Sequence, residues 1–356
     1  MATDLSSPLP RPSVGHRLLV TAGLLLAYRV GCQLPMPGVD ASIVARSYGL
    51  PLSMEQLSIF ALGVTPFFSV LIIFEFVKLI FPSLARWEVS EPSHARRLHG
   101  WIVLTALLVA TFQAAGLAGA LYEVRGLIDA PGWTVPIIMT LVAATALLGW
   151  FADLISRYGI GGGFWVLLVT PVLITLPAQA ATATEAVRQG IVSANALAVV
   201  IVFLAVAMAL IVMADSAWHG TARPNDTAAT DKPQVRVSGV DFMAVWPALL
   251  ASYFASLVVG LFGLFETSSG APLIAGGGPF HLLVIAASIV AFTWLQSKGD
   301  NSIRPMWSMA LVQIFVCVGG ALLTRSLTLP FAIDGVWLII VVTVIASTLR
   351  NLRPTA

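Results

Sequence analysis

Long apolar blocks separated by short polar segments dominate the sequence. Trp101–Leu121, Val192–Ala214 and Val336–Leu349 are apolar on every side of a helix. A helix of this kind lies in a protein core or spans a membrane, where about 20 apolar residues cross roughly 30 Å of hydrocarbon. We therefore predict ten membrane helices. They lie at about 18–36, 64–82, 99–121, 134–152, 163–177, 191–214, 242–265, 279–296, 305–325 and 333–349.

The fifth of these helices is predicted to be short and is interrupted by Pro171. A proline is tolerated inside a membrane helix where neighbouring helices satisfy the freed carbonyl. Five predicted helices precede the polar connection at 178–190 and five follow it. This divides the chain into an N-terminal tail (1–17), two halves (18–177 and 191–349) and a C-terminal tail (350–356).

Composition excludes an ordinary soluble domain. Charged residues make up 10% of the chain and apolar residues 58%, and the mean hydropathy is +0.91. Soluble domains carry about 25% charged residues, so this chain has too little charge to cover a soluble surface. The net charge of +2 is too small to indicate a nucleic-acid partner. The two cysteines, Cys32 and Cys317, indicate neither a disulfide framework nor a metal site.

The distribution of basic residues predicts the orientation. With the N-terminus in the cytosol, thirteen of the nineteen Lys and Arg residues fall on cytosolic segments and four on the opposite side. Because basic residues concentrate in cytosolic loops, both termini are predicted to be cytosolic. Arg11 and Arg17 precede the first apolar stretch, but Pro35-Met36-Pro37-Gly38 follows it where a cleavage site would stand. We therefore expect no cleaved signal peptide.

No catalytic constellation is present in the sequence, so we do not predict an enzyme, a cofactor or a metal site. The five histidines are dispersed, and no HExxH, GxSxG or P-loop pattern occurs. Arg29, Glu75 and Lys78 lie inside predicted spans, where charges often indicate transport. Glu75 and Lys78 are three residues apart and can pair on one helix face. A small-solute carrier remains an alternative, motivated by Glu75 and Arg29.

Two local patterns are unusual for a simple helix bundle. Gly159-Ile160-Gly161-Gly162-Gly163 opens the fifth helix and predicts a sharp re-entry turn, because glycine allows positive φ and close backbone approach. A plain tight turn between two helices is the alternative. The segment from Ser58 to Phe68 leads into the second helix, with Pro66 in the first turn, where proline is pre-organised.

At these residues the chain resembles the SecY family, the channel subunit of the general secretion translocon. Ser58–Pro66 matches the SIFALGI-x-P signature of that family, and Asp153–Gly163 is similar to its LITE-x-GIGNG turn. Glu88–His99 is similar to its first basic cytosolic loop, and Leu176-Pro177 fits the close of its fifth helix. Tyr28-Arg29-Val30-Gly31 resembles the end of its first helix. The resemblance covers essentially the whole chain and is strongest up to about residue 177.

The resemblance implies an all-α fold of two five-helix halves around an hourglass pore, which opens sideways to lipid between helices two and seven. A segment at about 39–57, including Leu57, would form a plug, although an ordinary external loop is the alternative. A narrow apolar ring would block ions by dewetting. Since most positions in these spans are apolar, ordinary packing would produce the same pattern. By the resemblance the ring falls on Val64, Phe68, Leu168, Val172, Leu249 and Ile340.

The chain departs from the family pattern at several positions. Gly162 replaces an asparagine in the glycine turn, Phe68 is bulkier than the usual ring residue, and Glu75 stands at the lateral gate where a neutral amide is common. The cytosolic loops at about 215–241 and 297–304 are short. In the family these two loops dock the motor SecA or the ribosome. Their reduction motivates a second hypothesis, a specialised or decayed paralogue with weakened partner coupling.

The resemblance also implies partners and a location. SecE-like and SecG-like small membrane subunits, secretory polypeptides and the lipid bilayer of a bacterial inner membrane are expected. SecA or the ribosome would dock on exposed cytosolic arginines. The candidates for this docking surface are Arg96, Arg97, Arg236 and Arg304.

Overall fold

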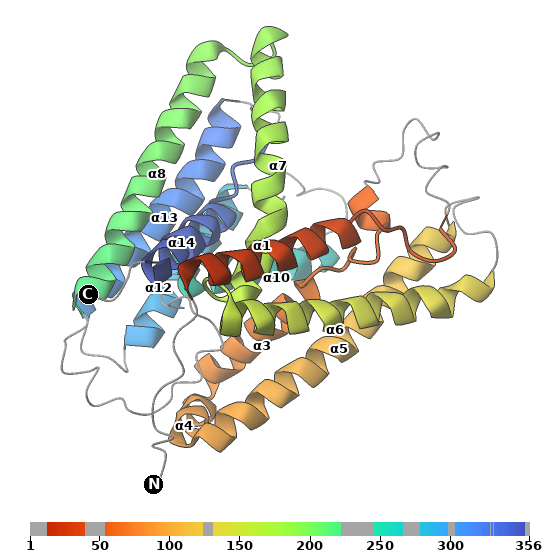
Figure 1. The fold of residues 1–356 in the computed structure, drawn as a ribbon. Helices are drawn as coiled ribbons and strands as arrows, with labels where there is room; N and C mark the ends of the chain where they lie inside the picture. Colours follow the sequence, from red (N-terminus) through yellow and green to blue (C-terminus); the bar gives the residue numbers. More distant parts are fainter. Residues whose placement is uncertain are drawn as a thin grey trace. The chain divides into compact units, whose positions relative to one another are not determined.

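The computed structural model describes residues 13–39, 54–123, 131–221, 245–265, 278–297, 303–327, 329 and 331–352. These residues form an all-α structure, as predicted (Figure 1). The first half contains α1 (Val14–Gly31), α3 (Thr65–Ile80), α4 (Pro82–Ser90), α5 (Pro92–Glu123), α6 (Thr134–Tyr158) and α7 (Gly163–Arg188). The second half contains α8 (Ala194–Thr221), α10 (Trp246–Phe265), α12 (Pro279–Ser297), α13 (Ile303–Ser326) and α14 (Gly335–Leu352).

Every predicted apolar segment overlaps one of these helices, although α1 ends at Gly31, before the predicted end of the first segment at 36. Within the described residues, six helices are individually long and apolar enough to cross a membrane, namely α5, α6, α7, α8, α13 and α14. A seventh span results if α3 and α4, between which the chain bends by 111°, are counted together. The all-helical membrane architecture is therefore confirmed, and the number of ten spans stays a prediction.

The fifth predicted helix is longer than expected. We predicted an end at Pro177, but α7 continues through both Pro171 and Pro177 to Arg188. The residues after Pro177 are rich in alanine, the strongest helix former, so the helix resumes its hydrogen bonding. It stops at Gly190, which has a φ of +74°, and the carbonyl of Ala186 accepts a bond of 2.9 Å from the Ile191 N–H. A glycine with positive φ is a common end of a helix.

The segment predicted as the first basic loop is helical. α4 ends at Ser90 and α5 begins at Pro92. Proline at the first helical position carries no N–H that would need a partner, so Pro82 and Pro92 each restart a helix directly after a break. The chain therefore turns sharply between α3 and α5 with helix on both sides of each break.

The chain forms two compact units, which are described separately. Unit 1 comprises Met1–Ser69, Val103–Leu168 and Thr348–Ala356, and unit 2 comprises Val70–Ile102 and Val169–Ser347. The boundary passes through α3, α5, α7 and α14.

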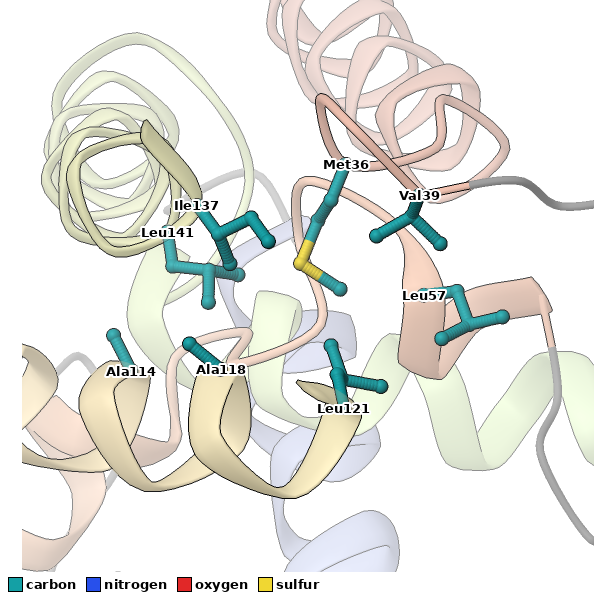
Figure 2. Close-up of a cluster of buried hydrophobic side chains, with 8 residues drawn as sticks. All are labelled: Met36, Val39, Leu57, Ala114, Ala118, Leu121, Ile137 and Leu141. Atoms are coloured by element: carbon teal, nitrogen blue, oxygen red, sulfur yellow. The ribbon is translucent and has the colours of Figure 1, made fainter. Parts of the chain in front are cut away.

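A buried apolar cluster forms the core of unit 1 (Figure 2). Side chains from α5, α6 and the segment after α1 point toward one another in this cluster. On α5, every fourth residue from Ala106 to Ala118 is a fully buried alanine. Small residues at this spacing let helices approach closely in a membrane. The members of the cluster are Met36, Val39, Leu57, Ala114, Ala118, Leu121, Ile137 and Leu141.

In unit 2, α8 packs beside α13, and α10 packs beside α12 and α13 (Figure 1). The Phe203 ring of α8 lies 5.5 Å from the Phe315 ring of α13. At the start of α14, a Cβ on Gly335 would lie 2.5 Å from the Cα of Cys317. Only glycine permits this approach of α14 to α13.

The outward faces of the helices are apolar, as a lipid environment requires. Phe112 on α5 is 82% exposed, and α8 exposes Val199, Ile201 and Val202. Soluble monomers rarely expose continuous apolar faces of this kind. These faces support the assignment of the helices to a membrane.

Candidate functional site

Three of the six predicted ring residues lie in unit 1. Val64 and Phe68 stand at the start of α3 and Leu168 stands on α7, and all three are buried, with 5–7% exposure. The ring centroid of Phe68 lies 6.5 Å from that of Phe164 and 6.4 Å from that of Trp165. The first pair is stacked and the second is edge-on, and aromatic pairs prefer offset-stacked or edge-on arrangements. The bulky Phe68 is therefore held in an aromatic cluster at the start of α7.

The other three predicted ring residues lie in unit 2. Leu249 in the first turn of α10 is 2% exposed, and Ile340 on α14 is fully buried. Val172 on α7 is half-buried. Burial suits both a closed constriction and ordinary packing, so the ring as a whole stays a prediction.

The SIFALG segment packs against the end of α1. The ring of Phe60 stacks on that of Tyr28 at 5.7 Å, and a Cβ on Gly31 would overlap it. Gly63 has a φ of +55°, and its N–H donates to the carbonyl of Phe60 over 2.8 Å. Thus two separate stretches of the family resemblance, Tyr28–Gly31 and Ser58–Pro66, meet in the structure.

The two ends of the predicted plug are joined to each other. The Met36 N–H donates to the carbonyl of Leu57 over 2.9 Å, and the Ile59 N–H donates to the carbonyl of Leu34 over 2.9 Å. Leu57, at the end of the predicted plug, is fully buried in the unit 1 core, and the plug itself stays a prediction. Residues 40–53, which make up most of the predicted plug, lie outside the described residues.

The backbone of the glycine turn lies close to neighbouring groups, and its role as a re-entry turn stays a prediction. Gly161 has a φ of +82°. A Cβ on Gly159 would lie 2.7 Å from the carbonyl oxygen of Ile155, and one on Gly163 would overlap the carbonyl oxygen of Ala152. The Gly162 carbonyl accepts the first backbone bond of α7, from the Val166 N–H over 3.0 Å. Gly162 therefore takes the N-cap position, where asparagine and glycine are both favoured.

Two side chains of α1 bind this turn, and sequence reasoning missed both. Arg17 Nε donates to the carbonyl of Gly159 over 2.9 Å, and the Ile160 N–H donates to Thr21 Oγ1 over 2.9 Å. Arg17 and Thr21 are four residues apart, so they share one face of α1. The signal available in the sequence is this pair of polar residues, four positions apart, on one face of an otherwise apolar helix. From the sequence alone, Arg17 is identified only as a cytosolic charge.

The charges inside α3 are paired, as predicted. Lys78 Nζ contacts Glu75 Oε1 three residues earlier, and it also lies 3.3 Å from Glu88 Oε2 on α4. Glu88 was not part of the prediction. Because Lys78 engages Glu75, the carboxylate is not an isolated ion site, and the motive for a solute carrier is weakened.

The predicted docking arginines are only partly described. Arg96 and Arg97 are exposed in the first turns of α5. Arg304 is the second residue of α13, and Arg236 lies outside the described residues. In the part of the chain that the structure describes, no group of three or more His, Cys, Asp or Glu side chains could hold a metal ion.

Comparison with known proteins agrees with the motifs. The model of the SecY family matches residues 58–304. The protein translocase subunit SecY of Escherichia coli strain K12 is 26% identical over 405 aligned positions, covering 95% of this chain and 90% of that protein. The corresponding subunit of Buchnera aphidicola subsp. Acyrthosiphon kondoi is 27% identical and covers 78% and 86%.

Solved structures show the same fold. A SecY structure from work on how the plug domain stabilises the closed translocation channel has a TM-score of 0.59, with 14% identity, covering 99% of this chain and 94% of that one. Sec61 in the canine ribosome–channel complex has a TM-score of 0.57 with the same identity and coverage. Since the family match extends over more than half of the sequence, the chain belongs to the SecY family.

Proposed function

We propose that this protein is a protein-conducting channel of a bacterial inner membrane, which moves unfolded polypeptides across the membrane or releases apolar helices into lipid. The observation that carries the proposal is the joint placement of the two family motifs in unit 1. The SIFALG segment leads directly to Val64 and Phe68, and the glycine turn leads directly to Leu168. The match to the Escherichia coli translocase subunit extends over 95% of this chain and 90% of that protein. The family forms channels rather than enzymes.

The proposed mechanism needs only an apolar constriction that yields to a peptide. All six ring residues are uncharged and apolar, so a narrow neck lined by them would exclude water and ions at rest. Phe68 would fill more of such a neck than an aliphatic residue. Its contacts with Phe164 and Trp165 give it a defined resting position from which it would have to rotate.

Orientation and partners form the finer part of the proposal. The excess of basic residues on one side supports cytosolic termini. Arg96 and Arg97 would then face the cytosol and offer positive charge to a docking partner. The ribosome in the related Sec61 complex is an example of such a partner. SecE-like and SecG-like subunits would complete the assembly, and the short loops near Arg236 and Arg304 would reduce the docking surface.

Site-specific crosslinking to a stalled secretory chain tests the proposal. Cys32 and Cys317, both buried, are first replaced by alanine. A single cysteine is then placed at Phe68 or at Val172, with a cysteine at Phe112 as the matched control, because Phe112 faces outward on α5. The proposal predicts crosslinks from positions 68 and 172 and none from 112, in membranes that contain the inserted protein.

A folded and inserted protein that crosslinks at neither ring position would refute the channel proposal for these substrates. Equal crosslinking at all three positions would also refute it, because the substrate would then be contacting the outer surface. The alternative hypothesis, a specialised paralogue, predicts no crosslinks at either ring position.

A further inference from the structure

Lys78 links α3 to α4 across the sharp break between them. The chain bends by 111° between α3 and α4, and only Phe81 lies between the two helices. Lys78 Nζ contacts Glu75 within α3 and reaches Glu88 Oε2 of α4 over 3.3 Å. The three side chains are 17–26% exposed, so water screens these contacts only partly. One ammonium group therefore holds two carboxylates, one on each side of the break.

A second contact links α4 to the start of α5. The ring of Trp87 stacks on that of His94, with centroids 4.4 Å apart and planes at 15°. Ser90 Oγ lies 2.9 Å from His94 Nδ1 and donates to the carbonyl of Trp87 over 2.7 Å. Glu91, at the break, lies 3.8 Å from His94 Nε2. Each of the two breaks is thus bridged by side chains from both adjoining helices.

We propose that the end of α3, all of α4 and the start of α5 form one rigid element, which we call the strap (Val70–Ile102), and that Lys78 is the positioning residue that holds its first bend. All residues of the strap belong to unit 2. A backbone break with a single linking residue would otherwise allow the two helices to change their angle. The ion pairs restrict that angle because any change separates Lys78 from Glu88 while Glu75 stays beside it.

The use of the strap in transport rests on the proposed function. In a channel that opens sideways beside α3, the cytosolic end of α3 could change position only together with α4 and the first turns of α5. Arg96 and Arg97 stand on those turns, so a partner bound there would be coupled to α3 through Lys78 and Glu88. Glu75, which differs from the amide common in the family, supplies the acid that keeps Lys78 at the bend.

Distance measurements between two spin labels test the strap without any substrate. The labels are placed at Ile80, exposed at the end of α3, and at Gly100, where added side-chain atoms meet open space on α5. In lipid nanodiscs the unsubstituted protein is expected to give one narrow distance. Lys78→Met is expected to raise the population of a second distance by roughly tenfold, the effect of losing a partly screened ion pair. Lys78→Arg is expected to restore the single distance.

The matched control breaks an ion pair elsewhere. Arg188→Met removes the exposed pair with Glu185 on α7, three residues apart, and it should leave the Ile80–Gly100 distance unchanged. A single narrow distance in folded Lys78→Met protein would overturn the proposal. A second distance that appears equally in Arg188→Met would overturn it too. A result in favour of the strap, combined with absent crosslinks at Phe68, would reject the channel function and leave the strap standing.

Discussion

The bonds from α1 to the glycine turn provide the most direct test of the structure, through the substitution Thr21→Val. Valine has nearly the shape of threonine, so packing is preserved and the hydroxyl is lost. Thr21 Oγ1 accepts the N–H of Ile160 over 2.9 Å and donates to the carbonyl of Arg17 over 3.0 Å. The substitution therefore removes one bond to the turn and one local bond within α1.

The two lost bonds have different costs. The Arg17 carbonyl keeps its helical bond inside α1, so the local loss is small. Ile160 is 4% exposed, so its N–H cannot donate to water once the Thr21 hydroxyl is removed. A buried donor left without a partner costs about 1–3 kcal/mol. We expect Thr21→Val to lower the free energy of unfolding by that amount.

Reversible unfolding in lipid–detergent mixtures measures this free energy, and Thr111→Val is the matched control. Thr111 also donates its hydroxyl to a carbonyl four residues earlier, that of Leu107 over 2.8 Å, but on an exposed face of α5. The difference between the two variants isolates the bond to the turn. If Thr21→Val were no more destabilising than Thr111→Val, the turn would not depend on α1 and the reasoning would be refuted.

Two further substitutions test close packing by the same unfolding measurement. Gly163→Ala places a Cβ against the carbonyl oxygen of Ala152, which also accepts the Ser156 hydroxyl over 2.8 Å. We expect Gly163→Ala to lower the free energy of unfolding by about 1–3 kcal/mol. Gly116→Ala, in open space on α5, should raise it by up to about 1 kcal/mol. The opposite order would contradict the close packing of the turn. Leu57→Ala should lower the free energy of unfolding by about 2–5 kcal/mol, because Leu57 is fully buried. A decrease below about 1 kcal/mol would mean that this position is not part of the core.

Apolarity was enough to predict where the helices lie. Every predicted apolar segment coincides with a described helix, because a membrane helix must satisfy its backbone internally and cover it with apolar side chains. Helix ends outside the apolar blocks were not predictable in this way. The extension of α7 beyond Pro177 depends on alanine propensity, and the early start of α5 at Pro92 lies in a charged stretch that reads as a loop.

The candidate site shows a similar division. The glycines of the turn and the pairing of Glu75 with Lys78 could be predicted because both depend on residues close in sequence. The contacts of Arg17 and Thr21 with the turn join positions about 140 residues apart. No local pattern specifies such a partner. The ring residues are a third case, since their neighbours are equally apolar and only the family resemblance singles them out.

Polar side chains in the spans therefore carry more positional information than apolar ones. An apolar residue packs acceptably against many neighbours, so its presence restricts the fold weakly. A polar group inside hydrocarbon must reach a specific partner or lose several kcal/mol. Thr21 at the glycine turn and Lys78 at the α3–α4 bend both obey this rule, and each has its partner where the chain changes direction. At the glycine turn and at the α3–α4 bend, a few polar contacts thus mark the partner of each segment, whereas the apolar residues around them do not.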